Sequence, residues 1–328
     1  MLQLYPDFRI GGKPKFVLAD KPPKLMKIPD EIRKCVVYVG YRLPNGEMSL
    51  QGTAFLVARA IDGTDLAFYY LITAAHVIRG ISSLDNFNGK VLLRVNFFDG
   101  NAYTIESDIN NWRFHPEQPE VDVAVLPNVA NLSDNTDVKA IPLWMFLDEI
   151  KLIEFDAGIG DEVFLTGLFH NHHGRKRNIP IVRAGNIAAM PEEKVLTRMG
   201  FIDAYLVEAR SIGGISGSPV FLYLSGMDRI YPKGTVLMGA GERVGNFYFL
   251  GLMHGHYNVD LLSEDAVDMD AKAREVVNMG IAIVIPSEKI LEVINQPMIK
   301  ENEDKQENLI RQSQLPTFDS VEVNTGLT

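Results

Sequence analysis

Residues 213–220 read GGISGSPV, a glycine-rich turn that carries Ser216 and leads into an apolar run. Glycines at such a turn permit positive φ values and expose backbone N–H groups. A serine hydroxyl becomes a nucleophile when a base takes its proton, a carboxylate orients that base and N–H donors face the oxygen that gains charge. The turn therefore favours Ser216 as a candidate nucleophile.

The base and the carboxylate have candidates in two apolar segments. Residues 70–77, YLITAAHV, form a hydrophobic strand that ends near His76. Residues 121–126, VDVAVL, place Asp122 inside an apolar strand. An unpaired carboxylate is costly there unless a donor such as an imidazole N–H pairs with it. We therefore expect His76, Asp122 and Ser216 to meet as one triad.

These three segments resemble the signatures of the chymotrypsin-fold, trypsin-like serine proteases. The matching stretches are TAAH at 73–76, DVAVL at 122–126 and GISGSP at 214–219. They follow one another in the family's order of His, Asp and Ser, at similar separations. The resemblance covers residues 33–298 and implies an all-β fold, with two six-stranded antiparallel β-barrels and a C-terminal helix.

The resemblance also implies a serine endopeptidase that works through an acyl-enzyme intermediate. Ser216 attacks the scissile carbonyl, His76 takes the hydroxyl proton and returns it to the leaving amine, and Asp122 fixes the imidazole tautomer. The backbone N–H groups of Gly214 and Ser216 form the oxyanion hole. Such an enzyme needs no cofactor and no metal.

Three positions depart from the secreted members of that family. Ile215 stands where members that mature by cleavage carry an Asp that pairs with the new amino terminus, so activation by that route is not expected. Cys35 is the only cysteine, so no disulfide can form within the chain. Ser218, followed by PVF, resembles the bacterial glutamyl endopeptidases and their relatives more than the vertebrate digestive enzymes.

Substrate preference is expected to depend on the segment before Ser216 and on a later strand. By the resemblance, Arg210 and Ser211 lie where the specificity pocket is built, and His254, Gly255 and His256 lie on the strand that pairs with substrate. An arginine or histidine there favours an acidic side chain at the cleaved residue through charge-assisted hydrogen bonds. The alternative is that Arg210 points into solvent or pairs with a structural carboxylate.

Short β-branched and aromatic runs, separated by Gly, Asp and Asn turns, favour a sandwich or barrel over a parallel α/β sheet. A hairpin with Asn45-Gly46 at its turn opens this region, and residues 286–294 form a closing helix. The expected segments are an irregular leader at 1–33, a first barrel at 34–157, a second barrel at 158–298 and a mobile polar tail at 299–328.

Composition narrows the range of partners. The chain has 328 residues, of which 46% are hydrophobic, so it can bury substantial cores. Its formal charge of −10 argues against binding to nucleic-acid phosphates. Its apolar runs fall short of the roughly 20 residues that span a membrane, and no secretory signal is visible. We expect a cytoplasmic protein whose partners are a protein or peptide substrate and a regulatory protein.

The same residues allow other interpretations. A noncatalytic binding or regulatory module could keep the triad residues and have a collapsed oxyanion loop. An α/β-hydrolase is disfavoured because residue 218 is not the required glycine and the order of the triad differs. The run HNHHGRKR at 170–177 has the composition of a solvated hairpin tip rather than of a metal or polyanion site.

Overall fold

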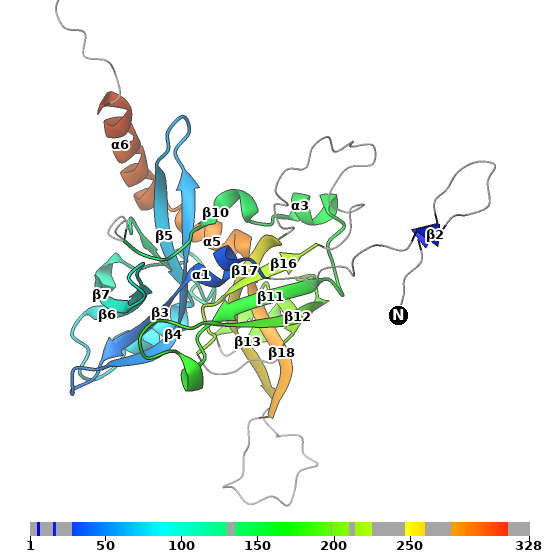
Figure 1. Cartoon of the computed structure of the whole chain (residues 1–328), viewed down its shortest axis with the longest axis horizontal. Helices are drawn as coiled ribbons and strands as arrows, with labels where there is room; N and C mark the ends of the chain where they lie inside the picture. The colour runs from blue at the N-terminus through cyan, green and yellow to red at the C-terminus, as the bar shows by residue number, and fades with distance from the viewer. Residues whose placement is uncertain are drawn as a thin grey trace, which may run out of the picture.

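Two β-sheet units make up the fold, one drawn in blue to cyan and one in green to orange in Figure 1. This computed structural model describes residues 28–129, 135–197, 199–209, 214–224, 247–259 and 277–313, together with the paired strands β1 (Tyr5–Pro6) and β2 (Phe16–Val17). The predicted all-β class is confirmed. The rest of the leader before residue 28, and the tail after residue 313, lie outside the described residues.

The first unit is an eight-stranded sheet with the order β7-β6-β3-β4-β5-β9-β8, and β10 pairs with β4 outside that path. All neighbours along the path are antiparallel. The sequence predicted a six-stranded barrel for this unit, but in the described part of the chain the path does not close into a barrel. It ends at β8, which has only two residues and so offers little backbone for pairing with a further strand. The elements are α1 (Asp30–Lys34), β3 (Val36–Arg42), β4 (Met48–Ala60), β5 (Ala67–Thr73), α2 (Ala75–Ser82), β6 (Lys90–Asn96), β7 (Ala102–Asp108), η1 (Ile109–Asn111), β8 (Arg113–Phe114), β9 (Ala124–Pro127), β10 (Ile141–Pro142), η2 (Leu143–Met145) and α3 (Glu149–Glu154).

As predicted, the second unit is a closed barrel of six antiparallel strands. Their order is β11-β12-β15-β18-β17-β16. A separate hairpin, β13 with β14, stands outside it. The elements are β11 (Glu162–Gly167), η3 (His170–His172), β12 (Ile181–Ala189), β13 (Val195–Thr197), β14 (Gly200–Ile202), β15 (Tyr205–Glu208), β16 (Pro219–Tyr223), β17 (Phe247–Val259), β18 (Val277–Pro286), α5 (Ser287–Ile294) and α6 (Pro297–Ser313).

Local sequence explains the first hairpin and the closing helix. Gly46 has a φ of +87° at the turn between β3 and β4, a conformation that glycine adopts without strain. Helix α5 follows Pro286 and buries one face, with Ile290, Val293 and Ile294 in the core. Both elements appear where the sequence predicted them.

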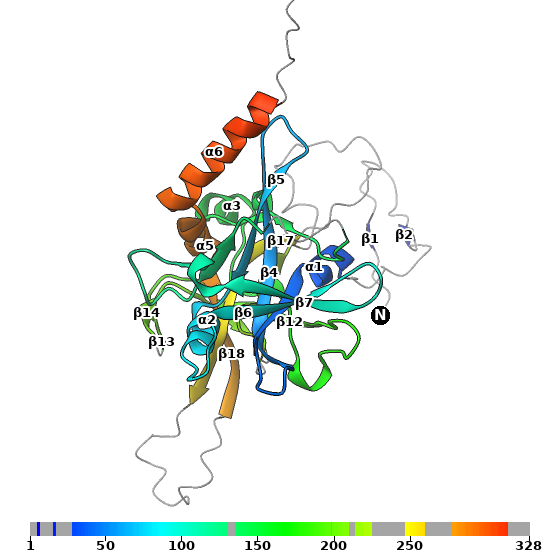
Figure 2. The same ribbon diagram turned by 90° about the vertical axis from the view of Figure 1, so that its left-hand side faces the viewer.

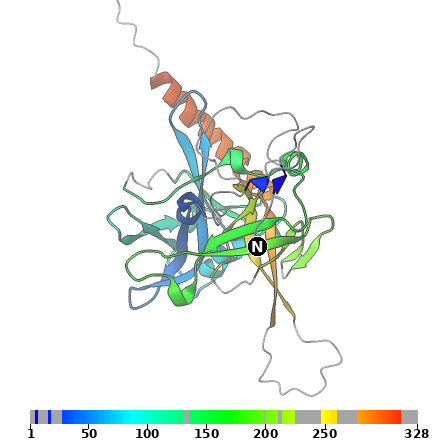
Figure 3. The same ribbon diagram turned by 45° about the vertical axis from the view of Figure 1, so that its right-hand side comes forward.

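The expectation of an unstructured tail from residue 299 is wrong as far as Ser313. This segment forms helix α6, which lies beside β5 in Figures 1 to 3. Ile299 is buried, and the buried Glu303 carboxylate accepts hydrogen bonds from Arg59 and from the hydroxyl of Tyr70. The charged run that predicted a mobile tail therefore contains Glu303, whose hydrogen bonds attach the helix to β4 and β5.

Packing between the units fixes their relative position. Phe55 of β4 contacts Phe249 of β17, with ring centroids 5.2 Å apart, and Phe221 of β16 contacts the same ring. Both belong to a continuous buried cluster that includes strands of both units, while a second cluster fills the barrel. No helix in the described segments has the length and apolar character that crossing a membrane requires.

Candidate active site

His76 lies at the junction between strand β5 and helix α2. The strand ends at Thr73 and the helix begins at Ala75, so His76 occupies the first helical turn. β5 pairs antiparallel with β9, with Thr73 opposite Ala124. This register brings Asp122, two residues before β9 begins, next to the start of α2.

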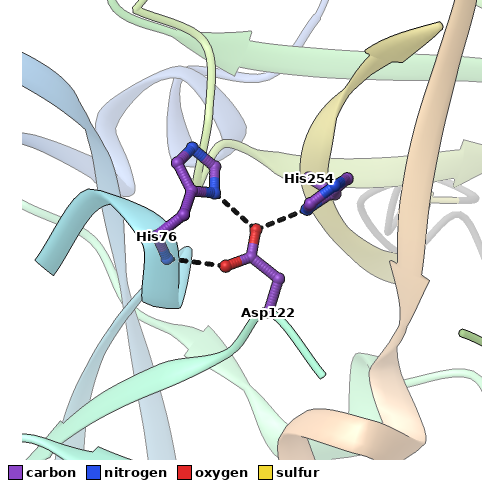
Figure 4. Close-up of side chains that lie close together, drawn as sticks. All are labelled: His76, Asp122 and His254. Atoms are coloured by element: carbon purple, nitrogen blue, oxygen red, sulfur yellow. Dashed lines mark hydrogen bonds and ion pairs between the residues drawn. The ribbon is translucent and has the colours of Figure 1, made fainter. Parts of the chain in front are cut away.

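The carboxylate of Asp122 is fully buried and accepts three hydrogen bonds, all visible in Figure 4. Its Oδ1 accepts the backbone N–H of His76 at 2.7 Å. Its Oδ2 lies 2.6 Å from Nδ1 of His76 and 2.5 Å from Nδ1 of His254. His254 belongs to β17 of the second unit, so this carboxylate joins the two units.

The protonation state of Asp122 follows from these contacts. Burial alone raises the pKa of the Asp122 carboxyl, but the hydrogen bonds from His254 and His76 outweigh burial and hold that pKa well below its usual range. The carboxylate is therefore ionised at neutral pH and can only accept hydrogen bonds. Each imidazole then carries a proton on Nδ1, which leaves Nε2 of His76 free to take a hydroxyl proton.

Ser216 lies on a turn that two glycines shape. Gly214 has a φ of +95° and Gly217 a φ of +81°. A Cβ at Gly217 would lie 2.2 Å from the carbonyl oxygen of Thr53, so a larger residue does not fit. The Gly217 N–H donates to the Met253 carbonyl at 2.8 Å, and the Ser216 carbonyl accepts the Thr53 N–H at 3.0 Å. The turn is thus held by β17 on one side and by β4 on the other.

Ser216 and the start of α2 approach the same strand residue, Gly52. A Cβ at Gly52 would lie 3.1 Å from the Ser216 carbonyl oxygen and 2.9 Å from Cγ2 of Val77, the residue after His76. Between these described residues, no hydrogen bond joins Ser216 Oγ to His76. Such catalytic hydrogen bonds are often long without substrate and tighten when it binds.

The N–H groups expected to form the oxyanion hole belong to Gly214 and Ser216. Within the described part of the chain, no backbone carbonyl accepts a hydrogen bond from either. The imidazole of His170 packs against this loop, because a Cβ at Gly214 would lie 2.8 Å from its Nε2. Burial, together with the nearby His173, lowers the pKa of His170. Sequence reasoning gave His170 no part in this site.

Thr53 is the second residue that sequence reasoning missed. Its Oγ1 donates to the Gly214 carbonyl at 3.0 Å and accepts the Leu168 N–H at 2.9 Å. Its own carbonyl accepts the Thr73 hydroxyl at 2.7 Å. Thr53 therefore ties β4, the end of β5 and the nucleophile turn together. In the sequence it is one threonine in an apolar strand, and nothing local marks it.

The structure describes only some of the residues that were expected to bind substrate. His254 turns its side chain to Asp122, while Gly255 pairs with Ile283 in the barrel. Arg210 and Ser211 lie outside the described residues, and for His256 only the backbone is described, paired with Ala282.

His76, Asp122 and His254 are also the described group whose ligand atoms could hold a metal ion, since these atoms lie within 4.8 Å of one another. Zn²⁺ binds nitrogen and oxygen ligands of this kind at about 2.0–2.2 Å. Here, however, Asp122 Oδ2 lies at hydrogen-bond distance from both Nδ1 atoms. An ion would have to displace both Nδ1 protons and separate these atoms. The arrangement therefore fits a hydrogen-bonded carboxylate better than a metal centre.

The chain matches no protein-family model and no curated protein sequence. Among solved structures it is similar to the crystal structure of the MamO protease domain from Magnetospirillum magneticum in its apo form. The TM-score is 0.45 and the identity 14%, over 80% of this chain and 96% of that chain. It is also similar to the crystal structure of Deg5, with a TM-score of 0.43 and 13% identity, over 80% of this chain and 88% of that one.

Proposed function

We propose that this protein is a serine endopeptidase with Ser216 as nucleophile, His76 as general base and Asp122 as the group that orients the base. The observation that carries the proposal is the short hydrogen bond between His76 Nδ1 and the buried, ionised Asp122. That bond fixes the imidazole tautomer in which Nε2 can act as a base. The glycine-rich turn then supplies a hydroxyl and two backbone donors.

The reaction proceeds in two steps. Ser216 Oγ attacks the carbonyl carbon while His76 Nε2 takes the hydroxyl proton, and the oxyanion is stabilised by the N–H groups of Gly214 and Ser216. The C–N bond breaks as His76 returns the proton to the leaving amine, which gives an acyl-enzyme. Water, deprotonated by His76, then attacks the ester, and Ser216 recovers its proton as the acid product leaves.

Preference for an acidic residue at the cleaved position is a finer part of the proposal. It rests on the resemblance to glutamyl endopeptidases and on the positive charge of Arg210, with His256 in support. We assign this preference to Arg210 and His256 rather than to His254, whose Nδ1 is paired with Asp122. Cleavage of a peptide library would reveal this preference, and products with neutral or basic residues before the cut would reject it.

Peptidase assays with a fluorogenic library test the main proposal. Ser216→Ala should reduce turnover by three or more orders of magnitude, the scale recorded for loss of a triad member. Ser218→Ala is the matched control, because Ser218 is on the same turn and its hydroxyl has no partner among the described residues. Equal cleavage by wild type and Ser216→Ala would reject the assignment.

A catalytically silent peptide-binding module is the second candidate. The observation in its favour is that Ser216 Oγ and His76 are not hydrogen-bonded in this structure. This candidate predicts that wild type and Ser216→Ala bind peptides equally and that neither cleaves them. Calorimetric titration alongside the cleavage assay separates the two candidates.

A further inference from the structure

Asp122 has one more imidazole than a triad needs. His76 already supplies the Nδ1–H that a base-orienting carboxylate requires. His254 donates to the same oxygen, Oδ2, at 2.5 Å. The two rings meet edge to face, with centroids 5.6 Å apart and planes at 84° (Figure 4). The two imidazoles thus share one carboxylate oxygen without stacking on each other.

His254 is partly buried beside the nucleophile turn. It lies on β17 at an irregularity in the pairing with β18, between Met253, opposite Val284, and Gly255, opposite Ile283, and its side chain is 13% exposed. The preceding residue, Met253, accepts the N–H of Gly217 at 2.8 Å and donates to the Ser218 carbonyl at 2.9 Å. The adjacent residues Met253 and His254 of β17 therefore contact the nucleophile turn and the Asp122 carboxylate of the first unit, respectively.

We propose that His254 is a positioning residue that fixes the Asp122 carboxylate, and through it His76, relative to the turn that carries Ser216. This inference rests on the proposed function, which it deepens. With Oδ1 bound to the His76 backbone and Oδ2 shared by two imidazoles, the carboxylate cannot rotate. The second donor also offsets the cost of burying a charge. His254 itself touches neither substrate nor the reacting atoms.

Two substitutions separate positioning from mere packing. His254→Ala removes the donor, while His254→Asn keeps an N–H near the place of Nδ1. For His254→Ala we expect kcat to fall about 10- to 100-fold with KM nearly unchanged, the scale seen when an orienting partner is removed. His254→Asn should recover most of the loss. His172→Ala, on the exposed turn η3, is the control.

Proton NMR of protein labelled with ¹⁵N-histidine gives a readout that needs no turnover. The wild type should show two far-downfield Nδ1–H resonances, one from each imidazole bound to Asp122. His254→Ala and His254→Asn should each lose one resonance; the remaining His76 resonance should broaden in the Ala variant and stay sharp in the Asn variant.

The kinetic and the NMR experiments together distinguish failure of this inference from failure of the proposed function. A wild type that does not cleave peptides but gives these spectra supports the positioning role and rejects the peptidase. A single downfield Nδ1–H resonance in the wild type, or equal impairment of the Ala and Asn variants, overturns the positioning role. Stoichiometric binding of Zn²⁺ at micromolar concentration with loss of both resonances also overturns it, because it assigns the cluster to a metal.

Discussion

A carboxylate removed from water costs several kcal/mol unless its oxygens are paired, and Asp122 has both oxygens paired although it is fully buried. Two of the three donors come from His76 itself, one from its backbone and one from its ring. The start of α2 and the segment before β9 are therefore locked together before any substrate binds. This is the preorganisation that a general base requires.

Thr53 gives the first prediction at the scale of single residues. Thr53→Val keeps the shape but removes Oγ1, which leaves the Gly214 carbonyl and the Leu168 N–H without this partner. Unfolding free energy should fall by about 1–3 kcal/mol, the cost of unsatisfied buried groups, and kcat should fall about tenfold as the turn loosens. Urea denaturation and peptidase assays measure the two effects. Unchanged values of both would show that Oγ1 does not hold the turn.

The sequence predicts only part of the site at this scale. A lone acid in the apolar run 121–126 needs a donor, and the pairing of Asp122 with an imidazole could be anticipated from that need alone. The parts played by Thr53 and His170, and the bond between Asp122 and His254, which was expected only to bind substrate, could not be found in this way. Gly214, which contacts both Thr53 and His170, and Asp122, which binds His254, lie more than 40 residues from these partners, and only the folded strands bring them together. The role of Ser216 stays a prediction until it is tested.

At the scale of elements, helix α6 is attached through one buried charge. Glu303 accepts hydrogen bonds from Arg59 at 2.5 Å and from the Tyr70 hydroxyl, and its side chain is 3% exposed. Arg59 also donates to Asn295, at the end of α5. These contacts join the helix to β4 and β5, in addition to the packing of Ile299 and Ile310 against the core.

Glu303→Ala should therefore destabilise the protein by about 3–5 kcal/mol, because it leaves a largely buried guanidinium and a buried hydroxyl without their acceptor. Glu301→Ala, two residues earlier on the exposed face, is the control and should change stability by less than about 0.5 kcal/mol. Thermal unfolding followed by circular dichroism measures both. Equal stabilities would mean that the Glu303 contacts contribute nothing.

Helix α6 is also an element that sequence patterns did not predict. The strand hairpin at Asn45-Gly46 and helix α5 have local signals, a turn dipeptide and a periodic apolar face, and both form as predicted. The run of acidic and basic residues at 300–307 has no such local signal, and its composition predicted disorder. The acceptor role of Glu303 depends on Arg59 and Tyr70, over 200 residues away.

At the scale of the whole molecule, polar contacts across the two units accompany the apolar packing. Asp137 of the first unit binds Lys34 at 2.9 Å and Arg177 of the second unit at 3.0 Å. Burial raises the pKa of the Asp137 carboxyl, but the hydrogen bonds from Lys34 and Arg177 outweigh burial and lower it. Asn96 and Asn178 exchange hydrogen bonds nearby. The run 170–177, expected to be a solvated hairpin tip, thus packs in part against the first unit.

Stability should depend on pH through this carboxyl. A pKa that is lower in the folded than in the unfolded protein stabilises the fold above the ordinary Asp value near 4, and this contribution is lost as pH falls through the folded value. Unfolding free energy should drop between pH 6 and pH 3, and should drop less in Asp137→Asn. Urea denaturation at both pH values measures this. Parallel losses in the two proteins would contradict it.

The six-stranded barrel of the second unit could be anticipated from the resemblance, whereas the long path of the first sheet and the docking of α6 could not. Barrel closure depends on regular pairing of strands with clear alternation and turns. The path of the first sheet ends at β8 on one side, and β10 pairs with β4 outside that path; each of these two strands has only two residues and carries no pattern to read.

The central claim is that His76, oriented by Asp122, activates Ser216. Labelling with a fluorophosphonate probe, followed by mass spectrometry of the peptides, tests it directly because the probe reacts fast only with an activated serine. We predict one adduct, on Ser216, whose formation slows by several orders of magnitude in His76→Ala. Absence of an adduct in the wild type, or an equal labelling rate in His76→Ala, would contradict the claim.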